Sequence, residues 1–213
     1  MYVPPANRVD DPDAVRAMVE GVGAADLVTV GPDGVPVSTL LPVLWSEDGS
    51  TVVAHMARAN EHWTTIADDA PALAIVSGAQ AYVTPSWYAA KAEHGRVVPT
   101  WNYSAVHLTG TVRVHDDPDW VRDAVTRLTL AHESTRQAPW AVEDAPAAFV
   151  AGQLRAIVGL EMTVTRVEAK AKLSQNRSEA DRAGVVAGLR AQPDPRSQAM
   201  ADQVASAVRP PRR

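Results

Sequence analysis

Residues 27–56 read LVTVGPDGVPVSTLLPVLWSEDGSTVVAHM, and this stretch decides the fold class. Three apolar runs rich in Val, Leu and Thr are separated by two turn clusters, Gly31 to Gly34 and Ser46 to Ser50. Apolar runs of this length, bounded by Gly, Pro and Asp, are typical of antiparallel strands joined by tight turns. The stretch therefore predicts a β-meander.

Similar patterns continue on both sides of the meander. We expect further strands at residues 72–77, 81–84, 104–115 and 157–167, and helices at residues 14–19, 60–67, 120–132 and 145–156, with two short helices within residues 178–208. Closely spaced strands of this kind favour a small barrel, so the sequence predicts a mainly β fold with peripheral helices (α+β). We expect one domain over residues 1–190 and a C-terminal helix with a frayed tail over residues 191–213.

Composition excludes several classes of protein. The 213 residues include 20 Lys and Arg against 25 Asp and Glu, a formal net charge of -5, so no overall positive field attracts nucleic acid. Cysteine is absent, which excludes disulfides, iron-sulfur clusters and thiolate-ligated metals. The sequence lacks both a signal-peptide pattern at its start and an apolar run long enough to span a membrane. We expect a cytoplasmic protein with no nucleic-acid or membrane partner.

Four blocks are dense in Trp, Tyr, Asn and basic residues, a composition that suits a pocket for a planar anionic molecule. Arginine and lysine bind phosphate or carboxylate oxygens, and Asn and Gln supply neutral hydrogen bonds. The blocks are HMARAN at residues 55–60, AYVTPSWY at residues 81–88, VPTWNY at residues 98–103 and KLSQNR at residues 172–177.

Together with the opening residues MYVP, these blocks resemble the PaiB-type family, described as FMN-binding negative transcriptional regulators and built on the FMN-binding split barrel. The resemblance runs in order over about residues 1–190. It implies an FMN-binding split-barrel fold and a homodimer with its cofactor sites at the subunit interface.

Three segments depart from the family pattern beside the expected cofactor site. Leu40-Leu41-Pro42 stands where the family usually has His-Leu-Pro, and Glu61-His62 follows Asn60 where the family has Pro and an uncharged residue. VSGAQ at residues 76–80 replaces the usual Phe-Gln-Gly-Pro-His. One branch of this family, the piperazate synthases, uses haem in place of flavin, and its iron ligand is a histidine. The resemblance to that branch implies haem b as the cofactor with His62 as the metal ligand, and FMN is the alternative.

The function implied by that branch is the haem-dependent conversion of L-N5-hydroxyornithine, a small amino-acid substrate, to L-piperazic acid by formation of an N–N bond. The alternatives are an FMN-binding PaiB-type transcriptional regulator and a split-barrel protein that carries or degrades haem. The expected cofactor-binding residues are Arg58, Asn60, His62, Trp63, Trp101, Lys172, Gln175 and Arg177, and the expected catalytic residues, at the edge of the pocket, are Tyr82, Ser86, Tyr88 and Lys91.

Several of these residues also have a structural interpretation, whereas Lys172 and Arg177 are hard to explain as part of a merely solvated face. A histidine such as His62 at the start of a short helix is more often a surface residue than a ligand. Trp63 and Trp101 could pack in a dimer interface, where Trp is enriched. The hydroxyls of Tyr82 and Tyr88 could simply satisfy backbone carbonyls.

Overall fold

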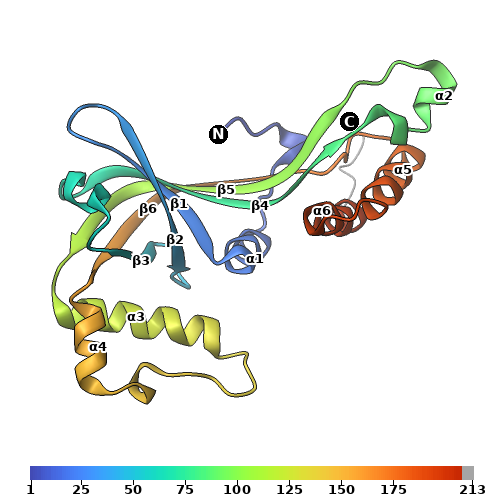
Figure 1. Cartoon of the computed structure of the whole chain (residues 1–213). Helices are drawn as coiled ribbons and strands as arrows, with labels where there is room; N and C mark the ends of the chain where they lie inside the picture. The colour runs from blue at the N-terminus through green and yellow to red at the C-terminus, as the bar shows by residue number, and fades with distance from the viewer. Residues whose placement is uncertain (208–213) are drawn as a thin grey trace. The chain divides into compact units, whose positions relative to one another are not determined.

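The computed structural model describes residues 1–207. Six strands form a closed barrel in the order β1-β2-β3-β6-β5-β4 (Figure 1). The predicted mainly β fold with peripheral helices is confirmed, and the expected frayed tail, residues 209–213, lies outside the described residues. The strands are β1 (Ala24–Val30), β2 (Pro36–Trp45), β3 (Thr51–Ala57), β4 (Ala70–Val83), β5 (Thr100–His115) and β6 (Ile157–Lys172).

The predicted meander is confirmed by the register of its strands. β1 pairs antiparallel with β2 from Ala24 opposite Pro42 to Val30 opposite Pro36, and β2 pairs with β3. The β1–β2 turn is closed by the Gly31 amide, which donates to the Val35 carbonyl. Gly34 has a φ of 78°, a left-handed conformation that Gly adopts without steric cost.

The prediction of two strands at residues 72–77 and 81–84 is wrong, because β4 is continuous across Gly78. A Cβ built on Gly78 would lie 2.3 Å from the Oγ of Ser104 on β5. The glycine therefore permits close approach of a neighbouring side chain and does not end the strand.

Within residues 1–207, five of the six α-helices and one 3-10 helix match the predicted helical segments within a few residues, whereas α2 (Ala90–His94) and three other 3-10 helices lie outside those segments. Asp117 caps α3 as expected from its sequence, since its carboxylate accepts from the amides of Asp119 and Trp120. None of the helices in residues 1–207 is both long and apolar enough to cross a membrane. The α-helices are α1 (Pro12–Val22), α2 (Ala90–His94), α3 (Pro118–Glu133), α4 (Ala147–Leu154), α5 (Glu179–Arg190) and α6 (Pro195–Ser206), and the 3-10 helices are η1 (Pro5–Asn7), η2 (Glu61–Thr65), η3 (Pro85–Trp87) and η4 (Val142–Asp144).

The chain forms two compact units. Unit 1 comprises residues 1–18, residues 77–106 and the chain from residue 168 onward, and unit 2 comprises residues 19–76 and 107–167. The long strands β4, β5 and β6 contribute residues to both units. The expected boundary at residue 190 stays a prediction.

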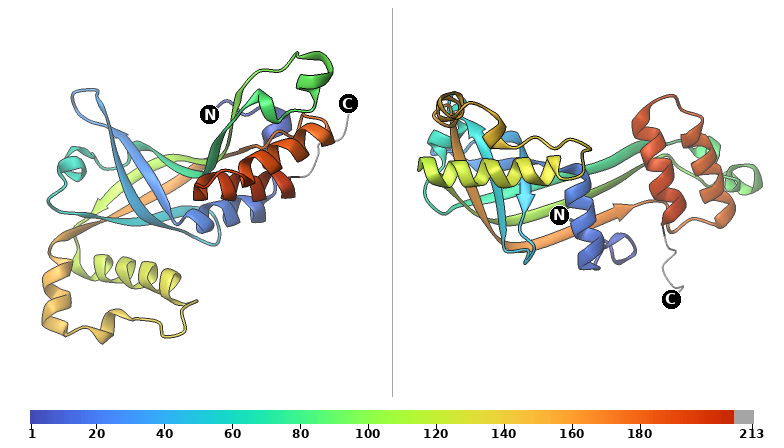
Figure 2. Two further views of the ribbon diagram at one scale, coloured as in Figure 1. Left: turned by 45° about the vertical axis from the view of Figure 1, so that its right-hand side comes forward. Right: turned by 90° about the horizontal axis from the view of Figure 1, so that it is seen from below.

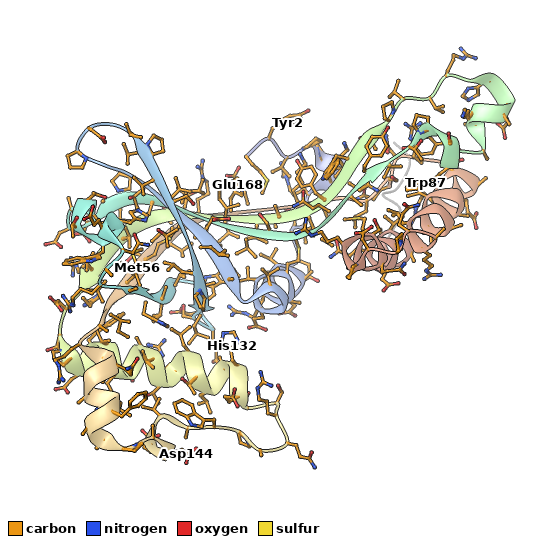
Figure 3. The ribbon with its side chains drawn as sticks, in the orientation of Figure 1. Tyr2, Met56, Trp87, His132, Asp144 and Glu168 are labelled. Carbon is orange, nitrogen blue, oxygen red and sulfur yellow. The ribbon has the colours of Figure 1, made fainter. Side chains whose placement is uncertain are left out.

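Unit 1 has a hydrophobic core of its own. Helices α5 and α6 lie side by side (Figure 2) and bury Val185, Leu189 and Met200 completely, together with Val83 of β4. Trp87 lies against α5 (Figure 3), where a Cβ on Gly184 would come within 2.0 Å of the Trp87 carbonyl oxygen. The C-terminal helices are thus integral to this unit.

Unit 2 contains the meander and the remaining halves of the long strands. Its core includes Met56, Leu108 and Leu160, each at most 2% exposed. The close approach of β5 to β6 in this unit depends on Gly110, because an added Cβ would lie 1.8 Å from the carbonyl oxygen of Thr163.

Candidate functional site

His62 is buried in unit 2 and held by hydrogen bonds on both sides of its ring. We call Thr29, Thr39, Asn60 and His62 the His62 cluster. The imidazole Nε2 lies 2.8 Å from the Oγ1 of Thr29 on β1, and Nδ1 lies 2.8 Å from the Oγ1 of Thr39 on β2. The Asn60 side chain caps η2 by accepting from the His62 amide at 3.1 Å and also donates to Thr39. The surface interpretation of His62 is wrong, because only 4% of the residue is exposed.

Burial lowers the pKa of His62, so the imidazole is neutral near pH 7. A neutral imidazole has one donor nitrogen and one acceptor nitrogen, which matches the two threonine hydroxyls. Iron also binds the neutral form of histidine, but here both nitrogens are already engaged. The His62 cluster in this arrangement does not fit the iron of a haem.

Arg58 is also engaged within unit 2. Its guanidinium forms a bidentate ion pair with Asp116, donates to the carbonyls of Arg155 and Ile157, and lies 5.6 Å from the ring centroid of Trp63. The Trp63 indole donates to the Arg58 carbonyl at 2.9 Å. This ion pair raises the pKa of Arg58 and lowers that of Asp116.

Arg58 lines a cavity in unit 2, which we call the Arg58 cavity. Its volume is about 510 Å³, its wall is mostly apolar, and three arginines and two aspartates belong to its lining. Its lining residues are Arg58, Asp116, Pro118, Asp119, Val121, Arg122, Ala151, Leu154, Arg155 and Ile157. The apolar wall and the arginines suit a flat molecule that carries an anionic group.

A second cavity, which we call the Tyr88 pocket, lies in unit 1 and has a volume of about 270 Å³. Four segments that are far apart in the sequence converge on it, including three of the aromatic and basic blocks. Its lining residues are Pro4, Ala6, Asn7, Tyr88, Val98, Pro99, Thr100, Asn102, Lys172, Ser174, Asn176 and Arg177.

The Tyr88 pocket contains two cations and an unpaired hydroxyl. The Lys172 ammonium donates to the Oγ1 of Thr100 at 2.6 Å, and the Arg177 guanidinium lies 4.3 Å from the centroid of the Tyr88 ring. Tyr88 is 3% exposed, and within residues 1–207 its O–H finds no hydrogen-bond acceptor, because the neighbouring Arg177 guanidinium can only donate. Burial raises the pKa of Tyr88, so the hydroxyl keeps its proton.

Two lining residues of the Tyr88 pocket, Asn102 and Ser174, were missed by the site prediction, although both lie inside the aromatic and basic blocks of the sequence. Asn102 is fully buried and donates to the Oγ of Ser174 at 3.0 Å. Ser174 has a φ of 60°, which is uncommon for a residue other than glycine. The neighbouring Gln175 accepts from the Leu173 amide and donates to the Ala171 carbonyl, so its side chain stabilises this turn.

The expected catalytic block does not form one cluster. Of its four residues only Tyr88 lines the pocket, and the Lys91 ammonium donates to the Ser86 hydroxyl on the protein surface. Tyr82 and Trp101 form a separate pair of half-exposed rings with centroids 6.4 Å apart, and the Trp101 indole donates to Gln80.

The expected cofactor-binding residues fall into groups in different units. Arg58, Asn60, His62 and Trp63 lie in unit 2, whereas Trp101, Lys172, Gln175 and Arg177 lie in unit 1. Among residues 1–207, no three side chains of His, Asp or Glu gather as metal ligands.

Comparisons with known proteins confirm the fold. Residues 1–166 match the protein family described as "Putative FMN-binding domain". "Protease synthase and sporulation protein PAI 2" of Bacillus subtilis is 29% identical over 204 residues, which are 95% of each chain.

Two solved structures share the fold at low sequence identity. The "FAD and Heme binding protein from Mycobacterium smegmatis" has a TM-score of 0.58 at 18% identity and covers 78% of this chain and 73% of its own. The "Flavocytochrome Anf3 from Azotobacter vinelandii" has a TM-score of 0.53 at 16% identity and covers 81% of this chain and 73% of its own.

Proposed function

The chain belongs to this FMN-binding domain family, and on that premise we propose that it binds FMN in the Arg58 cavity. The proposal rests on the volume of this cavity and on its lining of apolar side chains and arginines. About 510 Å³ lies within the range of roughly 300–1,000 Å³ typical of ligand pockets. All of its lining residues lie within the matched residues 1–166, whereas Lys172 and Arg177 lie beyond them.

The lining of the Arg58 cavity has the chemistry that a flavin nucleotide requires. Val121, Leu154 and Ile157 offer an apolar surface for a ring system. Because the Arg58 guanidinium is already paired with Asp116, Arg122 and Arg155 are the lining arginines that can bind phosphate oxygens in bidentate geometry. A bound flavin supplies hydride-transfer chemistry, and the residues of the chain bind and orient it. We also propose that the protein is a homodimer, as the family resemblance implies.

Titration with FMN tests the cofactor proposal. The purified protein should bind one FMN per chain, and Arg122→Gln should weaken binding about 10- to 100-fold, since a charged hydrogen bond contributes about 1.5–3 kcal/mol. Arg127→Gln is the matched control, because Arg127 lies on the same helix outside the cavity and pairs with Asp123. Flavin absorbance, measured during sedimentation, should move with a species of twice 22.7 kDa.

Three outcomes separate the parts of this proposal. Absence of flavin binding contradicts the cofactor assignment. Tight FMN binding that neither Arg122→Gln nor the cavity-filling Ala151→Trp weakens would place the flavin elsewhere in the protein. A monomer with FMN bound contradicts the dimer.

The second candidate function is a haem-dependent piperazate synthase. Its support is the set of departures from the family's flavin pattern at residues 40–42, 61–62 and 76–80. In that reaction the α-amine of L-N5-hydroxyornithine would bond to N5 as the N5–O bond breaks. The amine proton would leave with the hydroxide as water, so no external oxidant is required. Because both His62 nitrogens are engaged, we derive no haem-dependent step from this arrangement.

The synthase candidate predicts a product that mass spectrometry can detect. Protein reconstituted with haem should convert L-N5-hydroxyornithine to L-piperazic acid without NADPH or peroxide, and its visible spectrum should show histidine ligation. Haem-loaded protein that leaves this substrate unchanged would exclude the synthase and favour a haem carrier. Sequence-specific DNA binding by the FMN-bound protein would favour the regulator instead.

A further inference from the structure

We propose that the Tyr88 pocket is a separate binding site for a small carboxylate of about the size of an amino acid. The proposal goes beyond cofactor binding, because the pocket lies within unit 1 and shares no lining residue with the Arg58 cavity. It reassigns Lys172 and Arg177 from the cofactor to this second ligand.

The unpaired hydroxyl of Tyr88 is the first argument. A buried hydroxyl whose proton has no acceptor is destabilising and rare in native proteins, so its presence here indicates a missing partner. Because the hydroxyl keeps its proton, it can act only as a donor toward an anion. An oxyanion in the pocket would supply the missing acceptor.

The charges around Tyr88 match a ligand with a single negative charge. Lys172 and Arg177 line the pocket, and the buried Asp181 side chain, which accepts from the Ala90 amide at 3.0 Å, also acts on Tyr88. Two cations and one carboxylate leave an excess of one positive charge. Lys172 uses one of its three N–H donors on Thr100, which leaves donors for a ligand.

The volume of the Tyr88 pocket and its neutral polar lining residues favour a small polar ligand. About 270 Å³ is below the roughly 300–1,000 Å³ that is typical of ligand pockets, which favours a molecule smaller than a whole flavin nucleotide. Thr100, Asn102 and Ser174 bring neutral hydrogen-bonding groups to the lining. The left-handed backbone at Ser174 is the kind of strain that is often found at binding sites. The carboxylate group of such a ligand would bind Lys172 and Arg177, and its other polar atoms would form hydrogen bonds with Thr100, Asn102 or Ser174.

Calorimetric titration with three probes tests the site, using propionate, L-ornithine and inorganic phosphate. We expect both carboxylates to bind more tightly than phosphate, whether or not FMN is present. Arg177→Gln should weaken L-ornithine binding at least tenfold and Tyr88→Phe several-fold. Arg190→Gln is the control, because Arg190 lies on α5 outside the Tyr88 pocket and pairs with Asp202.

Tyr88→Phe also separates a binding role from a structural role. Because the O–H has no acceptor within residues 1–207, its removal should leave the urea midpoint of the ligand-free protein unchanged or higher. A lower midpoint would show that the hydroxyl has a structural role and would overturn the proposal. Failure of all three probes to bind, tighter binding of phosphate, or full L-ornithine binding by Arg177→Gln would overturn it as well. Each of these outcomes is independent of FMN binding by the Arg58 cavity.

Discussion

Replacing Gly110 with alanine should prevent stable closure of the barrel and lower the free energy of unfolding by more than about 3 kcal/mol. The added Cβ would lie 1.8 Å from the Thr163 carbonyl oxygen and 3.2 Å from the Val164 Cα. These are backbone atoms of β6, so no side-chain rotation can relieve the clash. Urea denaturation followed by tryptophan fluorescence measures the loss.

Gly21 provides a control for the same substitution. It lies in α1, and an added Cβ there meets nothing within 4 Å. Gly21→Ala should therefore leave stability unchanged or raise it by up to about 1 kcal/mol. A Gly110→Ala midpoint equal to that of the unsubstituted protein would show that β5 and β6 lie farther apart than the Gly110 geometry indicates.

His62→Ala should lower the free energy of unfolding by about 2–4 kcal/mol, because it leaves two threonine hydroxyls without their partner. Thr29 is 2% exposed, so water cannot readily replace the imidazole there. His94→Ala is the control, since His94 is exposed and accepts a hydrogen bond from the nearby Arg96 amide. An equal effect of the two substitutions would contradict the buried role of His62.

His62 should also make the free energy of unfolding depend on pH. Burial lowers the pKa of His62, and that of His55, below the value of about 6.5 expected in the unfolded chain. As the pH falls below about 6.5, the unfolded state therefore takes up protons that the folded state does not, and stability declines. The urea midpoint should fall between about pH 7.5 and about pH 5, and His62→Gln should reduce that slope. An unchanged slope would contradict a neutral His62 in the folded protein.

Thr29→Val separates the structural role of His62 from iron ligation. The substitution removes the hydroxyl beside Nε2 and leaves the imidazole in place. If His62 binds iron, Thr29→Val should retain or increase haem uptake while His62→Ala abolishes it. If neither substitution changes the haem spectrum, His62 is not the ligand and its role is structural.

The sequence by itself determined the meander and the approximate positions of the main helices. The turn at Gly31–Val35 and the cap at Asp117 depend on residues only a few positions apart, so their chemistry is visible in a short window. The continuity of β4 was less predictable. In the sequence Gly78 looks like the end of a strand, and only its close approach to Ser104 shows why a glycine stands inside one. Three of the family blocks, which the sequence singled out by their composition, contribute lining residues to the Tyr88 pocket.

Only the tertiary structure decided which polar side chains of the four aromatic and basic blocks, and of the neighbouring His62, are available to a ligand. His62 meets Thr29, 33 residues away, and Asn102 meets Ser174, 72 residues away, so their hydrogen bonds could not be predicted from local sequence. Gln175 appeared equivalent to Arg177 within one block, yet its amide is bound to the backbone while Arg177 lines a pocket. A buried polar group is satisfied or left unpaired by neighbours that the fold brings together, and that is why the unpaired hydroxyl of Tyr88 emerged only from the structure.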